Sequence, residues 1–329
     1  MSEFIGTKLT MNLGERSYDI IVKSGSLENL YQFARLDRRV AVVTDSGVPA
    51  QYAQMVADQC KDAHIITVPQ GEASKSFKIL ESVLKQMLEF GMGRGDLVIA
   101  VGGGVVGDLA GFAASIYMRG IDFINCPTTT LSMIDSSIGG KTAVDLGDTK
   151  NIVGAFWQPK LVIVDPDTLS TLPRRHFING LAEAVKASLL ADPELFAIFE
   201  NGDVDAQIGE IICRSLRFKK NIVEQDETEQ GMRKALNFGH TIGHGIEAVK
   251  GIKGRRTVGL YHGECVALGM LPMIESKALQ KRVRAVYRRL GLPLRTAYNK
   301  DKVYAEMLHD KKAQGGQITV IKVPGLGCW

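Results

Sequence analysis

The strongest constraint on the fold is an alternation, in the first half of the chain, between short β-branched runs and longer segments with helical periodicity. The helical segments occupy residues 73–91 and 108–118. The strand-like runs occupy residues 38–45, 64–69, 96–101, 122–127 and 160–165. Alternating strands and helices predict a parallel sheet that is covered by helices on both faces.

From about Leu172 the pattern becomes mainly helical. Helical periodicity recurs at residues 176–190, 194–200, 206–225, 236–249, 263–279 and 281–292. We place the boundary near the sequence GAFWQP. The predicted domains are therefore an α/β domain at residues 1–157 and a helical domain at residues 158–329.

The composition is that of an ordinary globular protein, with 45% hydrophobic and 23% charged residues. No apolar run reaches the roughly 18 residues that a membrane span requires. Residues 1–20 carry neither an apolar signal region nor a transit-peptide pattern, so we expect a cytoplasmic protein with no membrane partner. The net charge is only +4, and the basic segment at residues 281–290 is interpreted as a solvated helix face. We therefore expect no nucleic-acid partner.

A glycine-rich turn follows the strand-like run at residues 96–101. Gly102, Gly104 and Gly107 have the GxGxxG spacing, which lets a backbone approach a pyrophosphate at a helix N-terminus. The alternative is a tight strand-to-helix turn without a ligand. Asp45, at the end of an earlier strand, either binds an adenosine ribose or serves as a turn former.

The stretch CPTTTLSMIDSSIGGKTAVDLGDTKNIVGAFWQP is rich in hydroxyl groups, glycines and lysines. Lysines on glycine-flanked loops are suited to binding phosphate. Ile134 and Ile138 indicate a packed loop rather than an irregular solvent loop, and the polar residues of a packed loop need partners.

Two histidines stand four residues apart in the sequence LNFGHTIGHGIEAV. On a helix, His240, His244 and Glu247 would point to the same side. From spacing alone, the two histidines are either a pair of metal ligands or buried histidines that are satisfied within the helix.

Six segments, in this order, resemble the 3-dehydroquinate synthase family. They are GGGVVGDLAGFAAS, PTTTLSMIDSSIGGKTAVD, KNIVGAFWQP, GLAEAVK, NFGHTIGHGIE and HGECVALGM. The resemblance extends from GERSYDI to HDKK, almost the whole chain. It implies a Rossmann-like NAD-binding domain followed by a helical domain, and a homodimer.

The resemblance also implies a reaction. Members of the family convert 3-deoxy-D-arabino-heptulosonate 7-phosphate, a phosphorylated sugar acid, into 3-dehydroquinate, the second step of the shikimate pathway. NAD takes a hydride from carbon 5 and returns it after phosphate has been eliminated. A divalent cation, Zn²⁺ or Co²⁺, lowers the pKa of the reacting hydroxyl.

By this resemblance, Glu183, His240 and His262 are the expected metal ligands. His244 is expected to contact the substrate and to relay a proton, and Glu247 is interpreted as structural. The segment between His240 and His262 is a few residues longer than is usual in the family. A long loop closes at little extra entropic cost, so the third ligand can still reach the site.

The remaining site residues are carried over in the same way. For the substrate, they are Lys141, Lys186, Asp135, Asn237, Arg233, Lys219, Asn151, Arg119 from the neighbouring subunit, and Lys311 or Lys312. For NAD, they are Asp45, Glu72, Lys75, Gly103, Gly104, Val105, Asp108, Thr128, Thr129, Lys141, Lys150, Thr168, Thr171 and Asn179.

Two other enzyme classes share parts of this pattern. Sugar-phosphate cyclases that make inosose or valiolone rings usually change the SSIGGKT segment, which this chain keeps. Glycerol and iron-type alcohol dehydrogenases share the glycine turn but lack the phosphate-binding lysines. Both remain alternatives to the predicted function.

Overall fold

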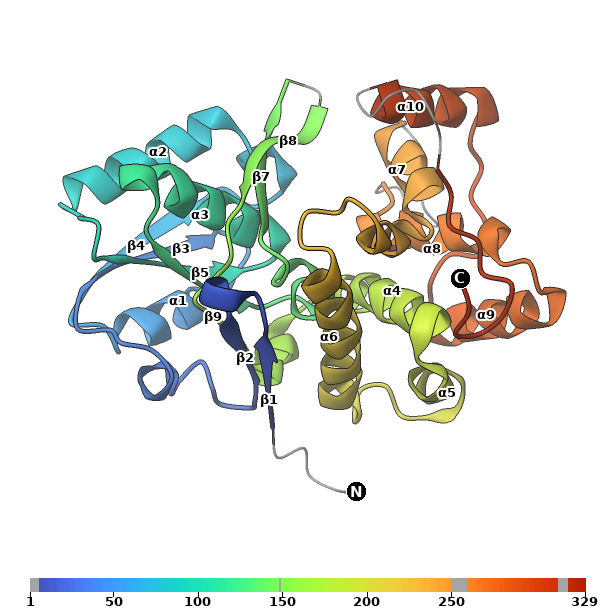
Figure 1. Cartoon of the computed structure of the whole chain (residues 1–329), viewed down its shortest axis with the longest axis horizontal. Coiled ribbons are helices and arrows are strands. Elements are labelled where there is room, and N and C mark those ends of the chain that lie inside the picture. Colours follow the sequence, from blue (N-terminus) through green and yellow to red (C-terminus); the bar gives the residue numbers. More distant parts are fainter. Residues whose placement is uncertain (1–5, 148, 250–251, 253–258, 313–318) are drawn as a thin grey trace. The chain divides into compact units, whose positions relative to one another are not determined.

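The computed structural model describes residues 6–147, 149–249, 252, 259–312 and 319–329, with side chains omitted at 309–312. The chain divides into two compact units, Met1–Pro173 and Arg174–Trp329. Figure 1 colours the first from blue to green and the second from yellow-green to red.

The first unit is built on a seven-stranded sheet. Its strands are β1 (Thr7–Met11), β2 (Tyr18–Val22), β3 (Arg39–Asp45), β4 (Asp62–Val68), β5 (Leu97–Gly102), β6 (Asp122–Pro127) and β9 (Leu161–Val164). In space they follow the order β1-β2-β9-β6-β5-β3-β4. All pairings are parallel except that of β1 with β2. The predicted parallel sheet is confirmed.

The position of β9 explains why the first unit extends beyond the predicted boundary at residue 157. This strand pairs with β2 on one side and with β6 on the other. Because it lies inside the sheet, residues 158–173 belong with the α/β unit, and the division falls after Pro173.

Helices cover both faces of the sheet, and Figure 1 shows α2 and α3 together on one face and α1 apart from them. They are α1 (Ala50–Ala57), α2 (Phe77–Glu89) and α3 (Gly104–Ile116). On one face, α2 and α3 pack against Ala41 and Val43. On the other face, α1 packs against Val40 and Val42. Consecutive side chains of β3 alternate between the two cores, which is why this strand reads as one continuous apolar run.

The strand order reverses between β3 and β5. From β3 the chain moves outward to β4, and it then returns to place β5 and β6 on the other side of β3. In open α/β sheets, ligands bind at the carboxyl ends of the strands that flank such a switch point. Asp45 ends β3 and Gly102 ends β5, so both lie at this position.

The polar stretch after β6 is more regular than the predicted loop. It contains a π-helical turn at Ser132–Ser136 and a two-stranded antiparallel ribbon of β7 (Lys141–Leu146) and β8 (Thr149–Phe156). Thr142 and Val144 are buried, and Val144 joins the core beneath α2 and α3. The polar stretch is therefore packed against the core, as expected, but through a two-stranded ribbon and not through a loop.

The second unit consists of helices. They are α4 (Arg174–Ala191), α5 (Pro193–Asn201), α6 (Ile208–Gln225), α7 (His240–Ala248), α8 (His262–Met270), α9 (Lys277–Leu290) and α10 (Lys300–Lys312). Helix α4 is almost continuously buried from Asn179 to Leu190, and α5, α6 and α8 contact it. Pro272 interrupts the predicted helical segment at residues 263–279, because proline has no N–H for the helix ladder.

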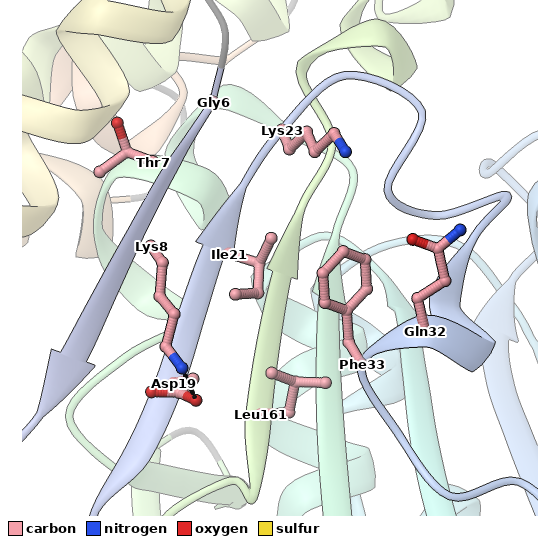
Figure 2. Close-up of a pocket in the computed structure, with 9 residues that line it drawn as sticks. All are labelled: Gly6, Thr7, Lys8, Asp19, Ile21, Lys23, Gln32, Phe33 and Leu161. Carbon is pink, nitrogen blue, oxygen red and sulfur yellow. Dashed lines mark ion pairs between the residues drawn. The ribbon is translucent and has the colours of Figure 1, made fainter.

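A groove of about 510 Å³ opens over β1, β2 and β9 of the first unit (Figure 2). Its polar side includes an ion pair of 2.7 Å between Lys8 and Asp19. The residues that line it include none of those predicted for the site. None of the helices among the described residues is long and apolar enough to cross a membrane.

Candidate active site

Glu183 is buried within the helical unit, with only 2% of its surface exposed. It sits in the middle of α4, and one carboxylate oxygen, Oε2, forms a very short ion pair with Lys186 one turn later. Neither oxygen accepts a hydrogen bond of ordinary geometry from the described part of the chain. Lys186 therefore balances the charge of this buried carboxylate, while Oε1 has no hydrogen-bond donor among the described residues that would compete with a metal ion.

Two imidazole nitrogens converge on the other oxygen of Glu183. His240 Nε2 lies 3.4 Å from Glu183 Oε1, and His262 Nε2 lies 3.7 Å from it. His240 is the first residue of α7 and His262 the first residue of α8. Three helices therefore bring the three predicted ligands together.

The second nitrogen of each ring is held by another group. His240 Nδ1 contacts the carbonyl oxygen of Phe238 at 3.2 Å, and His262 Nδ1 contacts Glu247 Oε2 at 2.9 Å. These contacts orient both rings so that Nε2 faces Glu183, as the outer partners of metal-binding histidines do. Glu247, interpreted from sequence as structural, thus touches a predicted ligand.

This donor set fits a divalent cation such as Zn²⁺ or Co²⁺. Ligand atoms at roughly 2.0–2.2 Å from a tetrahedral zinc stand roughly 3.3–3.6 Å apart. The distances of 3.4 and 3.7 Å at Glu183 are close to that spacing. One carboxylate and two imidazoles also leave a position for a substrate oxygen, as catalytic zinc sites do.

Electrostatics around the cluster support the same fit. Burial alone raises the pKa of Glu183, but the positive charge of Lys186 and of the imidazoles lowers it well below its ordinary value. Burial, with Lys186 nearby, lowers the pKa of His240 far below its ordinary value. Burial also acts to lower the pKa of His262, but the nearby Glu183 carboxylate and the contact with Glu247 raise it to about 10. A bound cation would replace the proton on His262.

His244 is a third histidine in the cluster. Its ring centroid lies 5.3 Å from that of His240 and 5.6 Å from that of His262. Ligand atoms of the three histidines lie within 4.8 Å of one another, so these histidines form a second set of donors that could hold a metal ion. The four-residue spacing does place His240 and His244 side by side.

Comparison with known proteins identifies the family. A family model of the 3-dehydroquinate synthase N-terminal region matches residues 65–179, and one of the C-terminal region matches residues 180–313. The chain belongs to the 3-dehydroquinate synthase family. The 3-dehydroquinate synthase of Streptococcus mutans is 42% identical, with 97% of this chain and 95% of that protein covered.

Two solved structures of sugar-phosphate cyclases have the same fold. A 2-deoxy-scyllo-inosose synthase complexed with carbaglucose-6-phosphate, NAD⁺ and Co²⁺ has a TM-score of 0.88 and 25% identity, covering 98% of this chain and 93% of that chain. A 2-epi-5-epi-valiolone synthase from Streptomyces hygroscopicus subsp. jinggangensis with NAD⁺ and Zn²⁺ bound has a TM-score of 0.85 and 29% identity. The match covers 96% of this chain and 92% of that chain.

In this member of the 3-dehydroquinate synthase family, three of the predicted substrate-binding cations of the helical unit are buried: Lys186, Lys219 and Arg233. Lys186 donates to the carbonyl oxygen of Leu236 at 2.9 Å, which ties α4 to the turn η7 (Met232–Asn237). Arg233 lies on that turn with 1% of its surface exposed, and Lys219 on α6 is 8% exposed. Asn237 donates to Glu229 at 2.8 Å.

Part of the predicted NAD-binding set of the α/β unit lies near the switch point between β3 and β5. Gly103 precedes α3, and Gly104, Val105 and Asp108 belong to its first turns. The Thr128 N–H donates to the Gly102 carbonyl, which joins the ends of β5 and β6, and Thr129 follows. The carboxylate of Asp45 accepts from the N–H groups of Gly47 and Val48, so it also serves as a turn former.

Several predicted cofactor residues already have protein partners. The buried Lys75 ammonium contacts Asp108 at 2.6 Å and also bonds to Asn151. Lys150 and Glu72 form an exposed ion pair of 3.8 Å. On the turn η6 (Pro166–Thr171), the hydroxyl of Thr168 donates to the carbonyl oxygen of Asp165, and that of Thr171 donates to the carbonyl oxygen of Thr168. In the helical unit, Asn179 Oδ1 accepts from the Gly263 N–H at 2.7 Å.

The remaining predicted residues lie on turns, on the ribbon and at the end of the chain. Asp135 belongs to the π-helical turn, and Lys141 begins β7 on an exposed surface. Arg119 is exposed on a turn after α3. Lys311 belongs to α10, but its side chain and that of Lys312 lie outside the described residues.

Proposed function

We propose that this chain is a 3-dehydroquinate synthase that converts 3-deoxy-D-arabino-heptulosonate 7-phosphate into 3-dehydroquinate and phosphate, with NAD and a divalent cation. The observation that carries the proposal is the convergence of Glu183, His240 and His262 in a chain of this family. The relative from Streptococcus mutans, which shares nearly the full length, supports the same activity.

Glu183, His240 and His262 would hold the cation, and the switch point of the α/β unit would hold NAD. When bound, the cation would make the substrate hydroxyl at carbon 5 more acidic, and NAD would accept its hydride and later return it. His240 and His262 present Nε2 because their other nitrogens are engaged, so the chain sets their orientation before any ion binds.

The basic residues of the chain would bind and orient the anionic substrate. Arg233 and Lys219 are buried cations, and a guanidinium in such a position matches a carboxylate in bidentate geometry. Lys186 lies beside Glu183 and so would meet the hydroxyls of a substrate bound there. His244 neighbours both predicted histidine ligands and would pass a proton to or from the substrate. Lys141, Asn151 and Lys311 would bind the phosphate.

An assay with purified protein tests this proposal. With NAD⁺, Co²⁺ and the heptulosonate phosphate, we expect equal amounts of phosphate and dehydroquinate and no accumulating NADH. A chelator should stop the reaction. Turnover of glucose 6-phosphate or sedoheptulose 7-phosphate instead would indicate an inosose or valiolone cyclase, and net NADH from glycerol would indicate a dehydrogenase.

We further propose that the enzyme is a homodimer in which Arg119 completes the site of the other subunit. Met118 and Arg119 both have left-handed backbone conformations, with φ of 52° and 71°. Such conformations cost about 1–3 kcal/mol each and cluster at functional sites. Ile116 and Met118 also expose 43% of their surfaces beside this arginine, which suits an interface.

Mixing two inactive variants tests the shared site. Arg119→Ala and Glu183→Gln should each lose activity, but a heterodimer of the two has one site with both defects and one with neither. After unfolding and refolding together, the mixture should recover about a quarter of the parent activity if subunits pair at random. A mixture as inactive as its components would show that Arg119 does not serve a neighbouring subunit.

A further inference from the structure

One face of α4 carries a row of three polar residues that all contact the beginning of α8. Arg175, Asn179 and Glu183 are spaced four residues apart, so they lie above one another on the helix. Glu183 meets His262, Asn179 accepts from the N–H of Gly263, and Arg175 binds Glu264. The first three residues of α8 are therefore each held by this row.

Arg175 makes the most extensive of these contacts. Its Nε donates to Glu264 Oε1 at 2.9 Å and its NH2 donates to Glu264 Oε2 at 2.8 Å, a bidentate pair. NH2 also donates to the carbonyl oxygen of Gly259 at 2.7 Å. The guanidinium carbon lies 4.0 Å from the centre of the Tyr261 ring, which His176 stacks against from 4.7 Å. One side chain thus holds positions on both sides of His262.

Glu264 connects Arg175 to the N-terminus of α8. Its Oε2 also accepts from the N–H of Tyr261 at 2.9 Å, which makes it part of a capping box at the start of α8. The carboxylate is mostly buried, with 14% of its side chain exposed, so the bidentate partner matters for its position. Without Arg175, the first turn of α8 would lose one of its contacts with α4 and the partner that fixes the capping carboxylate.

The backbones confirm that the two helices meet closely here. A Cβ on Gly263 would lie 2.0 Å from the carbonyl oxygen of Asn179. His262 precedes this contact directly, so its imidazole depends on how the first turn of α8 sits against α4. A shift of a few tenths of an ångström there would change the distance from His262 Nε2 to Glu183.

We propose that Arg175 is a positioning residue that acts through Glu264 to set the place of His262 in the metal site. The inference rests on the proposed function, since it takes Glu183, His240 and His262 as ligands. It concerns the geometry that the protein imposes on one ligand, so metal binding measures it more directly than turnover does.

Cobalt binding tests the proposal, with Arg174 as the matched control. Arg174 is the adjacent residue, pairs with Asp205 through two nitrogens and lies 4.6 Å over the Phe177 ring, but it does not contact α8 in the described structure. The dissociation constant of Co²⁺ would be measured by competition with a chelator, together with the visible absorption of the bound ion. Circular dichroism would verify folding.

We expect Arg175→Met to weaken Co²⁺ binding by about 10–100-fold, the usual effect of removing an outer partner of a metal ligand. The absorption spectrum should change as well, and Arg174→Met should stay within about twofold of the parent. The Co²⁺ affinity of Arg175→Lys should lie between those of the two methionine variants, because an ammonium keeps the charge but cannot form the bidentate pair. Glu264→Gln should weaken Co²⁺ binding as much as Arg175→Met does. The double variant that carries both substitutions should lose little further affinity.

The outcomes separate the two proposals. Equal affinity and spectra for Arg175→Met and Arg174→Met would overturn the positioning role, and additive losses in the double variant would overturn its route through Glu264. If Arg175→Met does not fold, Arg175→Lys decides, since an unchanged Co²⁺ affinity contradicts the proposal. If Glu183→Gln binds Co²⁺ as tightly as the parent protein does, the proposed metal site itself is overturned.

Discussion

Replacing Glu183 with glutamine should abolish turnover and weaken divalent-metal binding by more than about 100-fold. The substitution keeps the size of the side chain but removes the charge on which Lys186, His240 and His262 converge. Loss of a direct ligand should exceed the 10–100-fold effect of losing an outer partner. Atomic absorption after dialysis and a phosphate-release assay would measure both effects.

Glu194→Gln is the appropriate control for this experiment. Glu194 lies on α5 with 80% of its side chain exposed and pairs with Arg214 at the surface. We expect the loss of this charge to change neither metal content nor turnover, because exposed ion pairs contribute little to the stability of the fold. A Glu183→Gln enzyme that retains both metal and activity would contradict the proposed site.

The second large effect concerns Gly263. In Gly263→Ala, the new methyl group would lie 2.0 Å from the carbonyl oxygen of Asn179, so α8 must move away from α4. Backbone cannot yield as a side-chain tip does, and overpacking of this kind costs about 3 kcal/mol or more. We expect the thermal midpoint to fall by roughly 6–12 °C and Co²⁺ binding to weaken, because His262 would move with the helix.

Gly259→Ala provides the contrast in the same segment. A Cβ at Gly259 would meet no atom within 4 Å, and its carbonyl oxygen would remain available to Arg175. We expect its midpoint and Co²⁺ affinity to match the parent, as for most surface substitutions. If both alanine variants were equally stable, the close approach of the helices would not be important.

The elements that the sequence predicts best are those whose burial leaves a strong pattern. Strands β3 and β5 are buried on both faces, so they read as unbroken apolar runs. By contrast, β1 has only five residues, of which only Leu9 and Met11 are apolar, and α1 has only eight residues. Neither pattern is long enough to stand out, and neither element is predicted.

The candidate site divides in the same way. Spacing on one helix brings His240 and His244 together, and this is visible in the sequence. The approach of Glu183 to His262 joins two helices, and only the family resemblance pointed to it. From the sequence alone, the adjacent residues Arg174 and Arg175 cannot be assigned different roles. The direction of α4 alone decides which arginine reaches α8 and which reaches Asp205.

The ion pair between Lys186 and Glu183 has a consequence for the order of assembly. In many small zinc domains the ligands repel one another until the ion arrives, so metal uptake and folding are one event. Here a lysine already balances the buried carboxylate. We expect the helical unit to fold first and to load its ion afterwards. A cell short of the metal would then accumulate intact apoprotein that is ready for loading.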